Sequence, residues 1–251
     1  MASMDLASQY EQQYRWRSWQ QAYGPLPSLA GTRVLDLGCA IGEQSRDLAA
    51  RGAQVVGIDG NEELLARARS RGVPGATFTR GDIRDPQVQA PFDGIWASFV
   101  AAYFPDLPAV LSKWRELLRP GGWIALTEVS GMFDHQPLSS GACDFLKKYA
   151  HDSRQAGRYD FDMGGKLADH LVTCGFQVRK VDILPDRELS FSGPADPDVL
   201  VAWEARLDRM RLMRERALDA GLQIKAELLD CLSARGHTTE CRVHFCLARR
   251  E

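Results

Sequence analysis

A strand that runs into a glycine-containing loop constrains this chain more than any other feature of its sequence. The segment 34–42 reads VLDLGCAIG, so an apolar stretch is followed by Gly38 and Gly42. Glycine permits positive φ and lets a ligand approach the backbone, because it has no Cβ atom. A second apolar stretch, 55–58, ends at Asp59, where a carboxylate can accept hydrogen bonds from both hydroxyls of a ribose. Together the segments predict a βαβ unit that binds an adenosine-containing ligand.

The spacing of the glycines narrows the kind of ligand. A dinucleotide fingerprint has glycine at its first, third and sixth positions, whereas this chain has Ala40 third and Glu43 sixth. A nicotinamide-dependent dehydrogenase is therefore disfavoured. Taken alone, Gly38 and Gly42 are also compatible with a simple strand-to-helix turn. The motifs that follow in the chain decide between these interpretations.

Strand and helix patterns alternate along the chain. Helices are expected over 6–23, 44–51, 62–71, 107–118, 142–155, 166–174, 198–213 and 224–235, and strands over 33–37, 54–58, 76–79, 94–97, 123–128, 176–181 and 241–248. Such alternation predicts an α/β fold with a doubly wound, mainly parallel seven-stranded sheet and helices on both faces. An N-terminal helical arm and helical insertions complete the expected fold.

Four motifs in order, across residues 30–130, carry a family resemblance. They are VLDLGCAIG with its partner Asp59, GDI at 81–83, PFDGIWAS at 91–98 and LRPGGW at 118–123. The chain resembles the class I S-adenosylmethionine-dependent methyltransferases of the small-molecule type. The resemblance implies one methyltransferase domain over 1–251, with a helical arm (1–29), a cofactor-binding core (30–130), an insertion or lid (131–163) and a C-terminal part of the sheet (164–251) that contains a helical insertion (196–236).

The resemblance also implies a cofactor, S-adenosyl-L-methionine, with S-adenosyl-L-homocysteine as the product and no metal. Asp36 would hold the loop and, directly or through water, the ammonium of the methionine part, although a capping carboxylate is the alternative reading. Asp59 would bind the ribose, and Asp82 with Ile83 the adenine. The cofactor-binding residues implied in this way are Tyr14, Asp36, Gly38, Cys39, Gly42, Gln44, Asp59, Gly60, Asp82, Ile83, Ser98 and Phe99.

Two residues are candidates for a catalytic role on the acceptor side. His135 is the first candidate for a general base, because its ordinary pKa lies near neutrality, and a solvated loop histidine is the alternative. Tyr103 resembles a position where related small-molecule methyltransferases carry histidine, so a hydrogen-bonding role is expected there. Phe104, Glu128 and Asp134 are also expected near the carboxyl ends of the strands, where ligands gather.

Aromatic residues cluster in two further segments. Those of the arm could fold over the cofactor and exclude water, or pack in the core: Tyr10, Tyr14, Trp16, Trp19 and Tyr23. Those of the insertion could line an aromatic acceptor pocket or cover an exposed edge: Tyr149, His151, Tyr159 and Phe161. The expected helix 198–213 carries one stripe, read as packing: Val199, Trp203, Arg206, Met210 and Met213.

Composition excludes several classes of partner. The net charge is −2 and basic residues are interleaved with acidic ones, so no phosphate-backbone footprint and no nucleic-acid partner are expected. No apolar stretch of about 18 residues and no signal-peptide core occur, and the six cysteines form no zinc pattern. A cytoplasmic protein with reduced thiols, and no membrane partner, is therefore expected.

The function expected from the sequence is methyl transfer from S-adenosylmethionine to the oxygen or nitrogen of a small molecule, an aromatic compound or an amine, in specialised or cofactor metabolism. The alternatives are a nucleic-acid or protein methyltransferase and an adenosine-ligand-binding protein that is not an enzyme. Segment 97–100 reads ASFV, which differs from the Asn/Asp-Pro-Pro-aromatic signature of enzymes that methylate base amino groups. The identity of the acceptor and the oligomeric state stay open.

Overall fold

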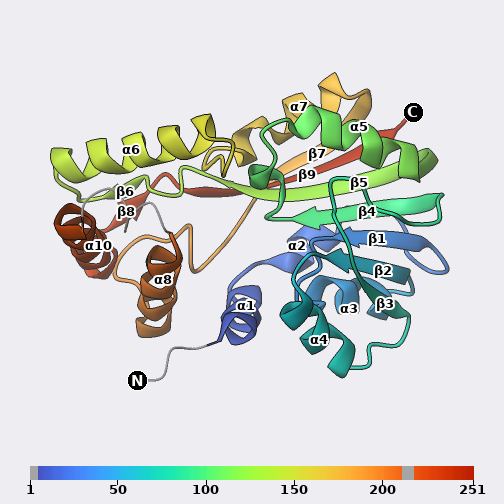
Figure 1. The fold of residues 1–251 in the computed structure, drawn as a ribbon, viewed down its shortest axis with the longest axis horizontal. Helices are drawn as coiled ribbons and strands as arrows, with labels where there is room; N and C mark the ends of the chain where they lie inside the picture. The colour runs from blue at the N-terminus through green and yellow to red at the C-terminus, as the bar shows by residue number, and fades with distance from the viewer. Residues whose placement is uncertain (1–4, 211–217) are drawn as a thin grey trace.

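A single seven-stranded sheet organises the chain (Figure 1). The fold is that of a computed structural model, which describes residues 5–210 and 218–251. The strand order is β3-β2-β1-β4-β5-β9-β7, and only β9 runs antiparallel to its neighbours. The strands are β1 (Arg33–Leu37), β2 (Gln54–Asp59), β3 (Ala76–Arg80), β4 (Phe92–Ser98), β5 (Leu118–Ser130), β7 (Phe176–Leu184) and β9 (Arg242–Arg250). The predicted doubly wound, mainly parallel sheet is confirmed.

Helices cover both faces of this sheet, as Figure 1 shows. On one side lie α1 (Leu6–Arg15), α2 (Trp19–Tyr23), α3 (Glu43–Ala50) and α4 (Glu62–Ser70), and on the other α5 (Leu107–Leu117) and α7 (Leu167–Thr173). Alternate residues of a strand point to opposite faces. Accordingly Val34 of β1 packs in one apolar cluster with Leu48 of α3, whereas Leu35 packs in the other with Trp114 of α5. The apolar strands are therefore buried on both faces, as a parallel sheet requires.

The remaining helices form a cap beyond one end of the sheet (Figure 1). They are α6 (Ser140–Gln155), α8 (Pro197–Arg209) and α10 (Leu218–Ser233), joined by a small ribbon of β6 (His135–Gln136) and β8 (Thr238–Thr239). Two short 3₁₀ turns, η1 (Ala101–Tyr103) and η2 (Gly164–Lys166), complete the elements. The sequence patterns did not predict the β6–β8 ribbon, because each strand is only two residues long and their pairing joins distant parts of the chain.

The N-terminal arm differs from the single helix expected over 6–23. It breaks after Arg15, and α2 begins at Trp19. Between the helices the backbone pairs with a distant segment: Ser18 N–H donates to the Pro185 carbonyl (3.2 Å) and Arg187 N–H donates to the Trp16 carbonyl (3.1 Å). These long-range hydrogen bonds replace local helical ones, which is why periodicity alone extended the helix too far.

Other expected bounds shift modestly. The helix expected over 142–155 begins earlier, at Ser140, because the Ser139 side chain caps it by accepting from Ala142 N–H. Of the helix expected over 198–213, α8 covers Pro197–Arg209, and residues 211–213 lie outside the described residues. All six cysteines are described and carry free thiols. None of the described helices is both long and apolar enough to cross a bilayer.

Candidate functional site

A cavity of about 800 Å³ opens at the carboxyl ends of β1, β2 and β4. Such a volume suits a ligand site, since pockets typically measure about 300–1,000 Å³. One side, the loop half, is lined by Gly38, Ala40, Ile41, Glu43, Gln44, Asp59, Gly60, Asn61, Leu64, Ile83, Ser98, Phe99 and Val100. The other, the helix half, is lined by Leu6, Gln9, Tyr10, Gln13, Tyr14, Arg17, Trp19, Tyr103, Met132, Tyr149, Ser153, Arg158, Tyr159, Phe161, Leu189, Arg206, Arg209 and Met210.

The glycine loop between β1 and α3 has the conformation that its sequence predicts. Gly38 and Gly42 adopt φ of 80° and 78°, a region that favours glycine. A Cβ atom on Gly38 would lie 2.3 Å from Cγ1 of Val100, and one on Gly42 would lie 2.7 Å from Cζ of Phe78. Both positions are therefore closed to larger residues by the protein itself. Ala40 also has positive φ, 46°, which costs an alanine about 1–2 kcal/mol.

Asp59 joins this loop to the end of β2. Its Oδ2 accepts a hydrogen bond from Ala40 N–H at 2.9 Å, and its Oδ1 accepts one from Asn61 N–H at 2.8 Å. A carboxylate can accept about four hydrogen bonds, so each oxygen keeps room for one more donor. Beside it, a Cβ on Gly60 would meet no atom within 4 Å. The carboxylate and the open space next to it fit the two hydroxyls of a ribose.

Asp36 lies behind the loop and does not line the cavity. Its buried carboxylate accepts a hydrogen bond from Ser45 Oγ at 2.5 Å, which ties β1 to the first turn of α3. Burial raises the pKa of Asp36 from 3.8 to about 7. Cys39 and Gly42 also lie outside the lining.

The structure also places the two residues implied for the adenine. Ile83 lines the cavity, whereas Asp82 is half-exposed and pairs with Arg84 at 2.7 Å. Of this pair, only Ile83 therefore faces the space in which a ligand would lie.

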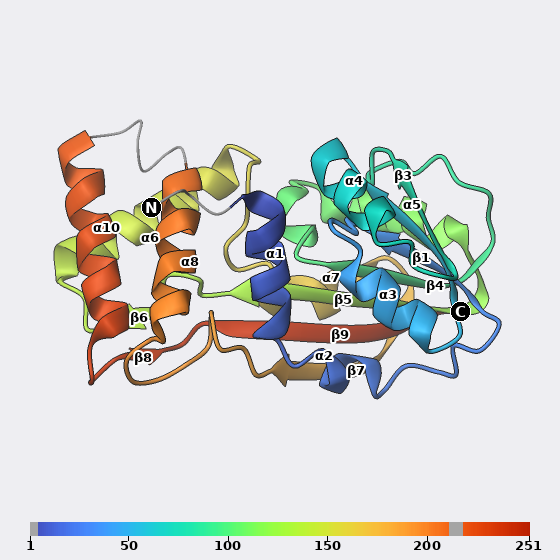
Figure 2. The same ribbon diagram turned by 90° about the horizontal axis from the view of Figure 1, so that it is seen from below.

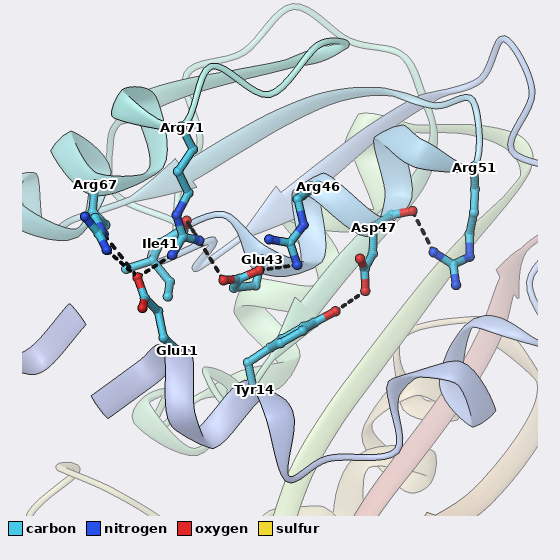
Figure 3. A network of polar contacts seen from close by, with 9 residues as sticks. All are labelled: Glu11, Tyr14, Ile41, Glu43, Arg46, Asp47, Arg51, Arg67 and Arg71. Atoms are coloured by element: carbon cyan, nitrogen blue, oxygen red, sulfur yellow. Dashed lines mark hydrogen bonds and ion pairs between the residues drawn. The ribbon is translucent and has the colours of Figure 1, made fainter. Parts of the chain in front are cut away.

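The N-terminal arm closes the loop half through a polar network (Figure 3). Glu11 of α1 pairs with Arg67 at 2.9 Å and with Arg71, and Arg71 reaches Glu43 at 2.7 Å. Tyr14 donates to the Asp47 carboxylate. The arm thus contacts both α3 and α4, and Tyr14 of the arm and Glu43 and Gln44 of α3 all line the cavity. A closed arm excludes water from the space where a ligand would react.

The end of β4 brings two predicted residues to the middle of the cavity. Phe99 has positive φ, 56°, and its N–H donates to the Thr127 carbonyl at 2.8 Å. The guanidinium of Arg17 lies 4.6 Å from the centre of the Phe99 ring. Ser98 Oγ is buried and has no hydrogen-bond partner within the described part of the chain. A strained phenylalanine and an unpaired hydroxyl therefore lie next to each other in the lining of the cavity.

A buried ion network supports the helix half. Arg17 pairs with Asp186 (Nε to Oδ2, 3.0 Å) and with Glu188 (Nη2 to Oε2, 2.9 Å), and Arg206 of α8 also pairs with Glu188. The carboxylates of Asp186 and Glu188 are fully buried. Arg206 and Arg17 hold the pKa of Glu188 below its usual value, although burial opposes them. This network fixes α8 against the segment that follows α1.

Glu128 lies at the end of β5, behind the tyrosines of the helix half. Its fully buried carboxylate accepts from Ala102 N–H (3.1 Å), Val129 N–H (3.0 Å) and Tyr159 Oη (3.3 Å). Burial raises the pKa of Glu128 to about 7. Tyr159 and the exposed Tyr103 meet edge to face, with ring centres 4.8 Å apart, and both line the cavity. Tyr103 therefore lines the cavity, whereas Glu128 does not.

His135 lies elsewhere. It is fully buried in β6, with Nδ1 2.9 Å from Nε2 of His237 and Nε2 3.2 Å from the Met132 carbonyl. Burial and His237 lower its pKa to about 3, so the ring is neutral. The expected alternative of a solvated loop histidine is wrong, because the β6–β8 ribbon and Trp203 enclose the ring. His135 also lies outside the residues that line the cavity, which leaves it no contact with an acceptor there.

The arginines are the main feature of the cavity that the sequence patterns did not single out. Arg17, Arg158, Arg206 and Arg209 all line the helix half, from three separate segments of the chain. One signal was present: Arg206 shares the stripe of Val199 and Trp203 on α8, where a charged residue is unexpected in a packing face.

Comparison with known proteins agrees with this geometry. A methyltransferase domain family matches residues 34–122. The chain is 43% identical over 194 residues to nocamycin O-methyltransferase of Saccharothrix syringae, covering 69% of this chain and 68% of the relative. It is 36% identical over 112 residues to trans-aconitate 2-methyltransferase of Deinococcus radiodurans, and this match spans 44% of the chain but only 42% of the relative's length.

Solved structures with the same fold include a methyltransferase from Bacillus halodurans, described as putative, and the cyclase SpnF. The first superimposes with a TM-score of 0.62 at 17% identity, covering 92% of this chain and 96% of that one. The second has a TM-score of 0.61 at 18% identity, covering 92% and 78%. At these identities the matches show the fold alone, and one fold accommodates proteins named for different reactions.

Proposed function

Because the chain belongs to the class I S-adenosylmethionine-dependent methyltransferase family, we propose that it transfers a methyl group from S-adenosylmethionine to a small organic acceptor. The observation that carries this proposal is the continuity of the cavity: the loop half and the helix half share one space of about 800 Å³. Cofactor and acceptor can therefore meet without a barrier between them. The names of the relatives, which specify trans-aconitate and nocamycin, support a small-molecule acceptor.

The residues of the loop half fit the cofactor in their chemistry. Asp59 has accepting capacity for the ribose hydroxyls, and Ile83 offers an apolar contact for the adenine. The loop at Gly38 lets backbone come close, and the unpaired Ser98 hydroxyl offers a polar contact. Asp36, behind the loop, would act on the methionine ammonium through water. When bound, the cofactor supplies a methyl group activated by a sulfonium, and it leaves as S-adenosylhomocysteine.

The protein's own contribution is positioning and the exclusion of water. Methyl transfer needs the nucleophile held in line, which rigid walls achieve without a dedicated base. The arm held by Glu11 and Tyr14 covers the loop half, and Arg17 fixes the Phe99 ring in the middle of the cavity. Tyr103 stands beside the acceptor space and would contact the acceptor. We also propose that 1–251 acts as one domain in the cytoplasm.

A binding protein that holds the cofactor without transfer is the alternative, since the shared fold also occurs in a protein named as a cyclase. Incubation with methyl-labelled S-adenosylmethionine and a small-molecule extract separates the two. The proposal predicts label in a small product, and no label after removal of the extract. Binding of S-adenosylhomocysteine without any transfer would favour the binding protein, and tight binding of NAD without S-adenosylhomocysteine binding would exclude both.

A further inference from the structure

The helix half also indicates the chemical class of the acceptor, an inference that rests on the proposed function. We propose that the acceptor is an organic acid, bound as its carboxylate by Arg158 and Arg209. These side chains come from the loop after α6 and from α8, and they line one cavity with the glycine loop. Figure 2 shows α1 between α8 and α4, so the arginine-bearing helix stands beside the arm that covers the loop half.

The charges of the helix half do not cancel. Arg17 and Arg206 are compensated by Asp186 and Glu188, the two buried carboxylates of the network. Arg209 donates to the amide oxygen of Gln9, which is neutral. No carboxylate pairs with Arg158 or Arg209 within residues 5–210 and 218–251.

Nearby carboxylates on the same elements are already paired with lysines. Asp208 and Glu204 of α8 bind Lys225, and Asp160 binds Lys166. Asp152 of α6 binds Lys148 at 3.1 Å. Glu128, behind Tyr159, accepts three hydrogen bonds and does not face the cavity. Within the described residues, Arg158 and Arg209 therefore have no ion-pair partner, and both side chains are also exposed to solvent.

Guanidinium groups favour a carboxylate over other partners. Their planar fork donates two parallel hydrogen bonds that match the two oxygens of a carboxylate. Aromatic rings line the same half of the cavity, and Tyr103, Tyr159 and Phe161 form a contiguous group there. An acid with a flat apolar body would lie against these rings while its charged end meets the arginines.

Among the described residues, the lining of this half provides no histidine or carboxylate that could act as a general base. A phenol or an ammonium must lose a proton before or during transfer, whereas a carboxylate is already a nucleophile at neutral pH. A carboxylate oxygen forms a bond to the methyl carbon as the carbon–sulfur bond breaks, and the electron pair of that bond stays on sulfur. The positive sulfonium and the negative acid give a neutral thioether and a neutral methyl ester, and no proton moves.

The test combines binding and product chemistry. Benzoate, trans-cinnamate and trans-aconitate are each compared with the corresponding amide for binding to protein saturated with S-adenosylhomocysteine. We expect at least one acid to bind about 10- to 100-fold more tightly than its amide, the range of a hydrogen bond to a charged group. Arg158→Gln and Arg209→Gln should remove this preference, whereas Arg235→Gln, which removes an exposed arginine outside the cavity, should keep it. Arg206 is left intact because it pairs with buried Glu188.

The stability of the labelled product in alkali identifies the kind of bond that the methyl group has formed. A methyl ester releases its labelled methyl group as volatile methanol in alkali, whereas aryl ethers and methylamines do not. Alkali-labile label whose yield falls in both arginine variants supports the inference. Alkali-stable label would overturn the inference while leaving methyl transfer intact. Equal binding of acids and amides, or no binding of any acid, would also overturn it. Failure of S-adenosylhomocysteine itself to bind would instead contradict the proposed function.

Discussion

The two halves of the cavity are built in different ways. The loop half is formed by residues between 38 and 100 that follow successive strands, and Asp59 in it accepts hydrogen bonds from the Ala40 and Asn61 amides. The helix half is formed by side chains from segments as distant as Arg17, Arg158 and Arg206. A site made at the ends of successive strands leaves motifs in order along the sequence, whereas a site made from distant side chains leaves scattered residues. The difference explains why one ligand was expected from the sequence and the chemistry of the other was not.

The substitution Glu188→Ala tests which contacts hold the helix half together, and we expect it to lower the free energy of unfolding most. Glu188→Ala leaves Arg17 and Arg206 with one buried carboxylate between them, because only Asp186 remains. We expect the free energy of unfolding to fall by about 3–5 kcal/mol, the usual cost of breaking a buried ion pair. Glu204→Ala, on the exposed side of α8, is the matched control and should cost less than about 1 kcal/mol. Denaturant titration of both variants measures the difference.

If Glu188→Ala and Glu204→Ala prove equally stable, the network is not what fixes α8. Where the Glu188 variant stays folded, its affinity for S-adenosylhomocysteine should be close to that of the original protein. A large loss of that affinity would mean that the two halves are not separable.

The next effect concerns a carboxylate behind the loop half. Burial raises the pKa of Asp36 from 3.8 to about 7, so the folded protein prefers it protonated. Its contribution to stability is fully present below pH 3.8 and is lost as the pH rises to about 7. Asp36→Asn does not titrate and keeps an oxygen for Ser45. In ligand-free protein, the free energy of unfolding of Asp36→Asn should therefore rise relative to that of the original protein, by up to about 4 kcal/mol between pH 4 and pH 8.

Denaturation at a series of pH values checks the Asp36 prediction, with Asp85→Asn, which replaces an exposed carboxylate, as the control. If the stability of Asp36→Asn and that of the original protein vary with pH in the same way, folding does not raise the pKa of Asp36, and the prediction is wrong.

A third substitution, Asp59→Ala, tests ligand binding in the loop half. Asp59→Ala removes the carboxylate that would accept from the ribose, and it also frees the Ala40 and Asn61 amides. We expect affinity for S-adenosylhomocysteine to fall by about 2–4 kcal/mol, because two charge-assisted hydrogen bonds are lost. Calorimetric titration measures this, with Asp85→Ala as the control. An affinity equal to that of the original would remove Asp59 from the site.

The smallest effect tests the strain in the loop. Ala40 has φ of 46°, which glycine adopts more easily, so Ala40→Gly should raise the free energy of unfolding by about 0.5–1 kcal/mol. Ala66→Gly, at an exposed position inside α4, should lower it by about 1 kcal/mol. Denaturant titrations that give a higher free energy of unfolding for Ala40→Gly and a lower one for Ala66→Gly support a strained loop. A lower free energy of unfolding in both variants would contradict it.

The sequence predicted the elements that depend on local signals. The strands, the glycine loop and the order of helices follow from apolar periodicity and turn residues, and their bounds moved by only a few residues. It failed where distant segments decide: the break after Arg15 depends on the backbone near Asp186, and the burial of His135 depends on pairing with Thr239. The arginines of the helix half share this origin, since no local pattern indicates that Arg158 and Arg209 line one cavity.

We propose that one cavity binds a methyl donor in the loop half and an organic acid in the helix half. A crystal structure of the protein with S-adenosylhomocysteine and the tightest-binding acid tests it most directly. We expect the ribose hydroxyls to bind Asp59 and the carboxylate to bind Arg158 or Arg209, with the body of the acid against Tyr159. S-adenosylhomocysteine bound with its ribose away from Asp59, or an acid bound outside the helix half, would contradict this proposal.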